Sequence, residues 1–212
     1  MAPAAEARTR WLIVGLAVTT GILGAFQIGK VPVALGDMRL DLGFGLIAAG
    51  WVISLFNFPA ILGGAPMGAV VARFGDRRVA LAGLLVLAAG GLCGALAPND
   101  TVLQVSRLIE GFAFLMTQVS APALIQRYAR TEDQRFAFGI WGAYMGTGQA
   151  IIMLAAPLII PAIGWRGLWL VNVALILAFV VVLALATGQP SVKPPVIRRV
   201  GPAELQIGRS HV

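Results

Sequence analysis

The chain has little charge for its length. Only 12% of its 212 residues are Asp, Glu, Lys or Arg, about half the share that is usual in a soluble domain. It has one cysteine, Cys93, and one histidine, His211, so a disulfide framework and a paired-cysteine metal site are excluded. A net charge of +7 does not indicate nucleic acid binding, because the basic residues form no stripe interleaved with aromatics.

These scarcities also argue against the enzymes and channels that have similar numbers of helices. An intramembrane serine protease needs a histidine within the membrane, but His211 is next to last in the chain. A lipid-headgroup transferase needs a cluster of acidic metal ligands, and only Glu110 lies well inside an apolar run. An aquaporin needs two Asn-Pro-Ala segments, and NFPA at residues 57–60 is a single near match. We therefore expect neither an enzyme nor a bound cofactor or metal.

What the chain has in abundance is long apolar runs. Hydrophobic residues make up 58% of the sequence, and runs of about 20 apolar residues are what a membrane-spanning helix requires. Six such runs cover residues 11–29 or slightly beyond, 44–72, 79–97, 101–128, 136–160 and 165–187. The sequence thus predicts an all-α membrane protein with a short N-terminal segment (1–10), a six-helix transmembrane domain (11–187) and a proline-containing, disordered tail (188–212).

The basic residues between the runs predict the orientation. Lys and Arg are concentrated in the loops on the cytoplasmic side of membrane proteins. With the N-terminus inside, the inner side holds Arg8, Arg10, Arg73, Arg77, Arg78, Arg127, Arg130, Arg135, Lys193, Arg198, Arg199 and Arg209. The outer side holds only Arg39 and Arg166, with Lys30 near that boundary. We expect a multi-pass protein of the cell membrane (the inner membrane in a Gram-negative bacterium) with both termini in the cytoplasm.

The loop between the second and third runs contains the segment GAVVARFGDRR. At minimum its arginines anchor the loop on the inner side. The segment also resembles the signature loop of the major facilitator superfamily, roughly Gly-x-x-x-Asp-Arg-x-Gly-Arg-Arg, although Ala72 stands where the family usually has aspartate. The resemblance implies a loop that gates the inner side of a transporter. Its expected members are Gly68, Arg73, Gly75, Asp76, Arg77 and Arg78.

Further segments are similar to the same family. LQVSRLIEGFAF (103–114) resembles its fourth-helix motif, and GWRGLWLVNVALIL (164–177) resembles its entry into the sixth helix. Residues 29–55 look like the first two helices of the cyanate and nitrate branches. Gly146 is followed by Thr147 rather than by proline, which argues against a drug antiporter of this family. The resemblance implies one six-helix half of the family's fold, built as two inverted three-helix repeats.

In that fold the first helix of each repeat lines the central cavity, here the first and fourth runs. Arg107, Glu110 and Thr117 share an arc of about 100° on the fourth run, and Gln27 and Lys30 share a similar arc on the first. The candidate substrate-binding or coupling residues are Lys30, Gln27, Arg107, Glu110, Thr117 and Tyr144. The alternatives are that Arg107 and Glu110 form a purely structural ion pair and that Lys30 only extends to the membrane interface.

The resemblance implies secondary transport of a small solute by alternating access. Lys30 and Arg107 both fall in the outer half of the expected cavity, which favours a small anion. Because the family normally has twelve spans, we expect the chain to need a second six-helix half or a homodimer partner, in addition to its solute and the surrounding lipid. The alternative is a truncated remnant that does not transport.

Overall fold

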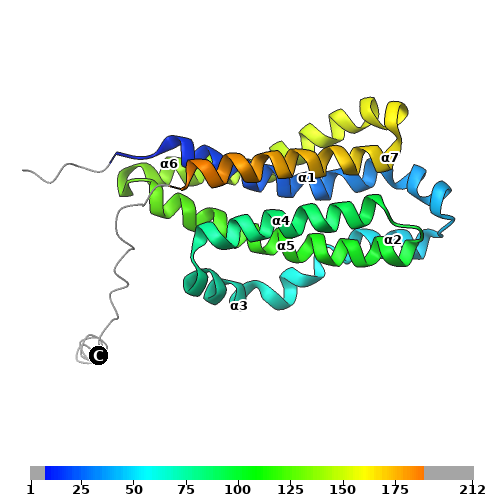
Figure 1. Ribbon diagram of the computed structural model, residues 1–212, viewed down its shortest axis with the longest axis horizontal. Helices are drawn as coiled ribbons and strands as arrows, with labels where there is room; N and C mark the ends of the chain where they lie inside the picture. Colours follow the sequence, from blue (N-terminus) through cyan, green and yellow to red (C-terminus); the bar gives the residue numbers. More distant parts are fainter. Residues whose placement is uncertain (1–7, 189–212) are drawn as a thin grey trace, which may run out of the picture.

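The computed structural model describes residues 8–188, and every regular element in that range is a helix. This confirms the all-α class expected from the apolar runs. The helices run along the long axis of one bundle, and residues 8 and 188 lie at the same end of it (Figure 1). The elements are α1 (Trp11–Leu42), α2 (Leu46–Ser54), α3 (Phe58–Phe74), α4 (Asp76–Ala95), α5 (Asp100–Tyr128), α6 (Thr131–Gly142) and α7 (Tyr144–Ala186).

Helix α1 is much longer than the apolar run that predicts it. Its 32 residues correspond to about 48 Å of helix, and it continues past Gly29 through Lys30 and Pro32. Lys30 does not end the helix because its side chain is fully buried inside the bundle. The helix ends at Gly43, whose left-handed conformation (φ 69°) lets its N–H cap the carbonyl of Arg39.

The second expected run is two helices rather than one. Helix α2 ends at Ser54 and α3 begins at Phe58, with a turn over residues 55–57. Figure 1 shows α3 displaced outward from the line of α2, on the outside of the bundle. Gly75 then links α3 to α4 with a φ of 89°, a conformation that glycine adopts without the steric penalty other residues incur.

The last two expected runs form α6 and α7 with a reversal inside α7. Gly164 has non-helical angles (φ 73°, ψ 173°), and the yellow and orange parts of α7 run in opposite directions on either side of it (Figure 1). In the described range, five continuous segments are long and apolar enough to cross a membrane, and the fifth covers 56 residues, Thr131–Ala186. The expected tail, residues 188–212, lies outside the described range except for Gly188.

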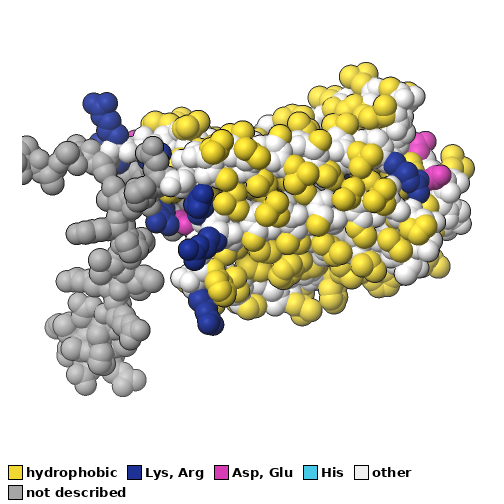
Figure 2. Space-filling view, in the orientation of Figure 1, with side chains coloured by type: hydrophobic (Ala, Val, Ile, Leu, Met, Phe, Trp, Pro, Cys, Tyr) yellow, Lys and Arg dark blue, Asp and Glu magenta, His cyan; other side chains and the backbone are white. Residues whose placement is uncertain are grey.

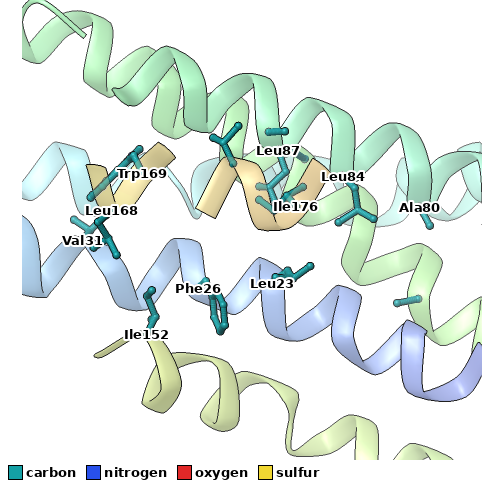
Figure 3. Close-up of a cluster of buried hydrophobic side chains, with 14 of the residues drawn as sticks. Leu23, Phe26, Val31, Ala80, Leu84, Leu87, Ile152, Leu168, Trp169 and Ile176 are labelled. Atoms are coloured by element: carbon teal, nitrogen blue, oxygen red, sulfur yellow. The ribbon is translucent and has the colours of Figure 1, made fainter. Parts of the chain in front are cut away.

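The core lies between α1, α4, α5 and the part of α7 after Gly164. Figure 3 shows Leu84 and Leu87 of α4 beside Ile176 of α7, with Leu23 and Phe26 of α1 below them and Phe26 pointing toward the part of α7 that carries Ile152. The outer surface is also largely apolar. Figure 2 shows a broad hydrophobic band between two ends that carry the charged side chains, the distribution that a protein surrounded by lipid requires. The molecule is a multi-pass membrane protein.

Candidate functional site

Three charged side chains meet inside the bundle, and we call them the charge triad: Lys30 of α1 with Arg107 and Glu110 of α5. The Lys30 Nζ lies 2.7 Å from Glu110 Oε1, and the Arg107 guanidinium pairs with Glu110 Oε2. Arg107 is 1% exposed and the other two are fully buried. Glu110 therefore uses one carboxylate oxygen for each cation.

Polar groups of neighbouring helices complete the surroundings of the triad. The Gln27 Oε1 accepts a hydrogen bond from Lys30 Nζ at 2.5 Å, and the Gln27 carbonyl accepts one from Arg107 Nη2 at 3.0 Å. A third bond runs from Arg107 Nε to the carbonyl of Val52 on α2, at 3.2 Å. The hydrogen bonds of the triad thus connect α1, α2 and α5.

Each cation also lies on an aromatic ring. Lys30 Nζ is 4.2 Å from the centre of the Trp169 ring on α7, and Arg107 Cζ is 4.5 Å from the centre of the Phe56 ring. A cation over an aromatic face is stabilised by the ring quadrupole, more so when water is excluded. The rings therefore compensate in part for the hydration that both cations lose.

Two cations and one carboxylate leave the triad with an excess of one positive charge. A buried charge that loses its partner is strongly destabilising, so the three groups depend on one another. All three are already engaged by protein groups. Because they are 0–1% exposed, no solute can touch them in this arrangement of the helices.

The other two predicted site residues lie apart from the triad. Thr117 donates its hydroxyl to the Phe114 carbonyl at 2.8 Å, and its methyl faces Gly83 of α4. Tyr144 stacks on Trp141 with ring centroids 4.3 Å apart, and both rings lie against Gly21 of α1. The structure therefore brings Gln27 together with the triad but places Thr117 and Tyr144 at two separate positions.

Tyr144 belongs to a second group of side chains, which we call the aromatic patch: Trp141, Tyr144, Phe114 and Gln118. Phe114 and Gln118 of α5 both lie against Gly24, one turn along α1 from Gly21. All four residues are half-buried. Within residues 8–188 the buried Gln118 Nε2 has no hydrogen-bond partner. The patch therefore combines three partly buried aromatic rings with one buried amide donor that no group in residues 8–188 accepts.

The predicted gating loop forms a network at the end of the bundle where residues 8 and 188 lie. Asp76 Oδ1 accepts hydrogen bonds from Arg127 Nη1 of α5 and from the Arg77 N–H, both at 2.8 Å. Arg77 in turn donates from Nε to Thr187 Oγ1 at 2.8 Å and from Nη2 to the Ala184 carbonyl at 3.0 Å. The start of α4 is thus bound to the ends of α5 and α7.

The remaining loop residues do not join this network. Arg73 lies over the ring of its neighbour Phe74, at 5.5 Å from the ring centre. Gly68 and Arg78 are exposed. The carboxylate of the network comes from Asp76, four residues after Ala72, the position where the resemblance led us to expect an acid.

Sequence reasoning missed the aromatic and backbone partners of the triad. Phe56 and Trp169 are two of fifteen Phe and Trp residues, and nothing in their spacing distinguishes them from core side chains. Arg127 was expected only as an inner-side charge, and its pairing with Asp76 depends on where α5 ends. The Val52 carbonyl is available because α2 stops at Ser54. Asn57 and Pro59 mark the start of α3, but proline is tolerated inside membrane helices, so the sequence predicts that the run continues through them.

Comparison with known proteins supports the family suggested by the motifs. The family model for the Major Facilitator Superfamily matches residues 12–210. The puromycin resistance protein pur8 of Streptomyces alboniger is 29% identical over 166 residues, covering 77% of this chain and 33% of the relative. The methylenomycin A resistance protein of Bacillus subtilis is 26% identical over 155 residues (72% and 33%).

A relative with a different activity is equally similar. The galactose-proton symporter of Escherichia coli K12 is 29% identical over 163 residues, covering 70% of this chain and 35% of the symporter. The chain spans about a third of the length of these three relatives. With a family model matched over nearly its whole length, the chain belongs to the Major Facilitator Superfamily.

Proposed function

We propose that the chain is one six-helix unit of a secondary transporter, which moves a small solute by alternating access together with a second six-helix unit or a second copy of itself. The observation that carries the proposal is the buried charge triad between α1 and α5. Ionisable groups at membrane depth are expensive and are usually kept for transport or coupling. Membership of a transporter family supports the same activity, and a remnant without function would have no need of the triad.

The six-span topology is part of this proposal. The segment Thr131–Ala186 would be about 84 Å long as a straight helix, far longer than a hydrocarbon core of about 30 Å. Its reversal at Gly164 supports two crossings. Four candidate spans precede this segment, so two crossings here give six in total. An even number of crossings places both chain ends on the same side. Figure 2 shows Lys and Arg side chains concentrated at that end, which supports a cytoplasmic location.

A reporter fused after Thr187 tests the topology. We expect a fusion partner that works only in the cytoplasm to be active there. Activity of a partner that works only outside the cytoplasm would contradict the proposed orientation.

The need for a second unit is supported by glycines that have nothing packed on them. A Cβ added at Gly64 or Gly68 of α3, at Gly139 or Gly142 of α6, or at Gly146 of α7 would meet no atom within 4 Å. Small residues on membrane helices allow other helices to approach closely. We infer that the faces of α3 and of the α6–α7 junction receive the second unit.

Two observations bear on the solute. Once α1 and α5 separate, the aromatic patch with its unpaired Gln118 amide would suit a solute with a flat face and a hydrogen-bond acceptor, such as a sugar ring or a planar drug. The excess positive charge of the triad favours a small anion as the second candidate. The relatives named above act on galactose or confer resistance to antibiotics. Uptake of a sugar, an antibiotic and a small anion therefore distinguishes the flat-faced solute from the anion.

The test is uptake of labelled galactose, puromycin and nitrate by cells that express the protein with all the sequence its gene encodes. We expect uptake or extrusion of at least one probe, and we expect Arg107→Lys to abolish it. Lysine keeps the charge but lacks the planar fork that holds several acceptors at once. Arg135→Lys, a change at an exposed arginine of α6, is the matched control. Normal transport by Arg107→Lys at normal surface expression would contradict a role of the triad in transport.

A further inference from the structure

The turn between α2 and α3 interrupts backbone hydrogen bonding within a membrane-spanning segment. Here the Leu55 N–H donates to the Trp51 carbonyl, four residues back as in an α-helix, whereas the Asn57 N–H donates to the Ser54 carbonyl, only three residues back. Because α2 ends at Ser54, the Val52 carbonyl does not continue the helical ladder. An unpaired carbonyl inside a membrane would cost several kcal/mol, so a break at this depth needs a partner from elsewhere.

Arg107 supplies that partner. Its Nε donates to the Val52 carbonyl at 3.2 Å, while its terminal nitrogens hold the Gln27 carbonyl and the Glu110 carboxylate. The guanidinium plane also lies against the ring of Phe56, which is inside the turn. One side chain of α5 therefore binds the broken segment through both a hydrogen bond and an aromatic contact.

A glycine keeps the turn close to α5. A Cβ added at Gly111 would collide with the carbonyl group of Phe56, so only glycine allows the two backbones to touch here. The Phe56 ring also packs on Phe114 of α5, with centroids 5.2 Å apart. Apart from these contacts α2 and α3 are mostly exposed, with two buried residues in each.

We propose that Arg107 is a positioning residue that clamps the break at residues 55–57 against α5, and that this break is a hinge of the transport cycle. The inference rests on the proposed transport function. Any event that draws the guanidinium away from Val52, such as binding of a solute or loss of the Glu110 charge, frees that carbonyl. The Phe56 N–H can then bond to it, which continues α2 into the turn and moves α3 away from α5.

The hinge can be measured without any solute. We suggest double electron–electron resonance between nitroxides at Ile61→Cys on α3 and Leu177→Cys on α7, with Cys93→Ser, in lipid nanodiscs. Both labelled positions are exposed, and Cys93 is the only native cysteine. The parent protein should give one narrow distance distribution.

Arg107→Gln and Arg107→Lys should each broaden this distribution and add a second, longer-distance population. Arg107→Lys keeps the charge of the triad and decides the matter if the glutamine variant does not fold. Arg166→Gln is the matched control, because Arg166 also donates to a backbone carbonyl, that of Ala97 at 2.7 Å, while its partners Ala97 and Asp41 belong to neither α2 nor α3.

An unchanged distribution in Arg107→Lys would overturn the proposal, and so would an equal shift in Arg166→Gln. The measurement is separable from the transport assay, since the distances are recorded on the chain itself. A protein that transports none of the three probes can still show the clamped hinge, and a transporter can lack it.

Discussion

The inner helices and the two peripheral segments of this bundle differ sharply in how well they are covered. In the most apolar stretch of α1, 67% of residues are buried, and the values for α4 and α5 are 56% and 50%. For the α2–α3 segment the value is 17%, and for α6–α7 it is 33%. The inner helices are thus largely covered by other helices of the chain, whereas the faces of α3 and α6 are largely exposed.

The space around the glycines also differs between covered and exposed helix faces. A Cβ at Gly94 of α4 would meet Trp169 and Ser106, and one at Gly148 of α7 would meet Ala25 and the Ile22 carbonyl. The glycines of α3 and α6 named above meet nothing. The contrast is one of degree, because Gly15 and Gly36 of α1 also meet nothing and a Cβ at Gly63 of α3 would meet Leu115.

The largest effect should follow removal of the shared acid of the triad. Glu110→Ala leaves two buried cations without a counter-ion, and we expect it to lower the free energy of unfolding by about 3–5 kcal/mol. Unfolding in mixed micelles containing SDS, followed by tryptophan fluorescence, measures the change.

The matched comparison is Asp41→Ala, which removes an ion pair with Arg166, the Asp41 and Arg166 side chains being 46% and 37% exposed, and a hydrogen bond from the Trp165 indole N–H. Exposed pairs contribute about 0–1 kcal/mol. Similar losses for Glu110→Ala and Asp41→Ala would mean that the triad is hydrated, against the buried geometry described here.

A smaller effect should separate two glycines that lie two residues apart on α7. Gly148→Ala places a methyl group 2.7 Å from the Ile22 carbonyl, and such overpacking costs about 1–3 kcal/mol. Gly146→Ala has open space and should be neutral or stabilise the helix by up to about 1 kcal/mol. The same unfolding assay applies. If both variants behave alike, the contrast between the packed and open faces of α7 is wrong.

The smallest effect concerns the loop network. Arg77→Ala removes the two hydrogen bonds that hold the end of α7, and we expect a loss of about 1–2 kcal/mol with earlier proteolytic cleavage after Thr187. Arg78→Ala changes an exposed neighbour and should stay within about 0.5 kcal/mol of the parent. Equal cleavage rates in the two variants would argue that Arg77 does not hold the helix end.

Much of the fold could be predicted from the sequence because lipid demands long apolar helices. The apolar runs indicated where helix lies and located the loop at Gly75, where a glycine and four nearby charges coincide, but they did not indicate how the second, fifth and sixth runs divide into helices. The boundaries failed where burial overrides composition. Lys30 looks like the end of a span, but α1 continues through it because its charge is paired with Glu110 of α5. The break before Phe58 is stabilised by Arg107, which lies fifty residues later in the sequence.

The site was predictable to the extent that charge is rare within the spans. Lys30, Arg107 and Glu110 stand out for that reason, and a helical wheel places Gln27 beside Lys30. Thr117 shares the arc of Arg107, but almost three turns further along its side chain faces Gly83 of α4. The roles of Phe56 and Trp169 depend on how helices are placed in space, which periodicity does not reveal.

The central claim is that this chain works as one unit of a two-unit transporter. The most direct test is exchange of labelled galactose, puromycin and nitrate across proteoliposomes that contain the purified chain, with copies per vesicle counted by single-molecule photobleaching. The account predicts no exchange in vesicles with one copy, and exchange only where a second unit is present, whether a second copy or a co-reconstituted partner. Exchange of any probe by vesicles that hold a single copy would contradict it.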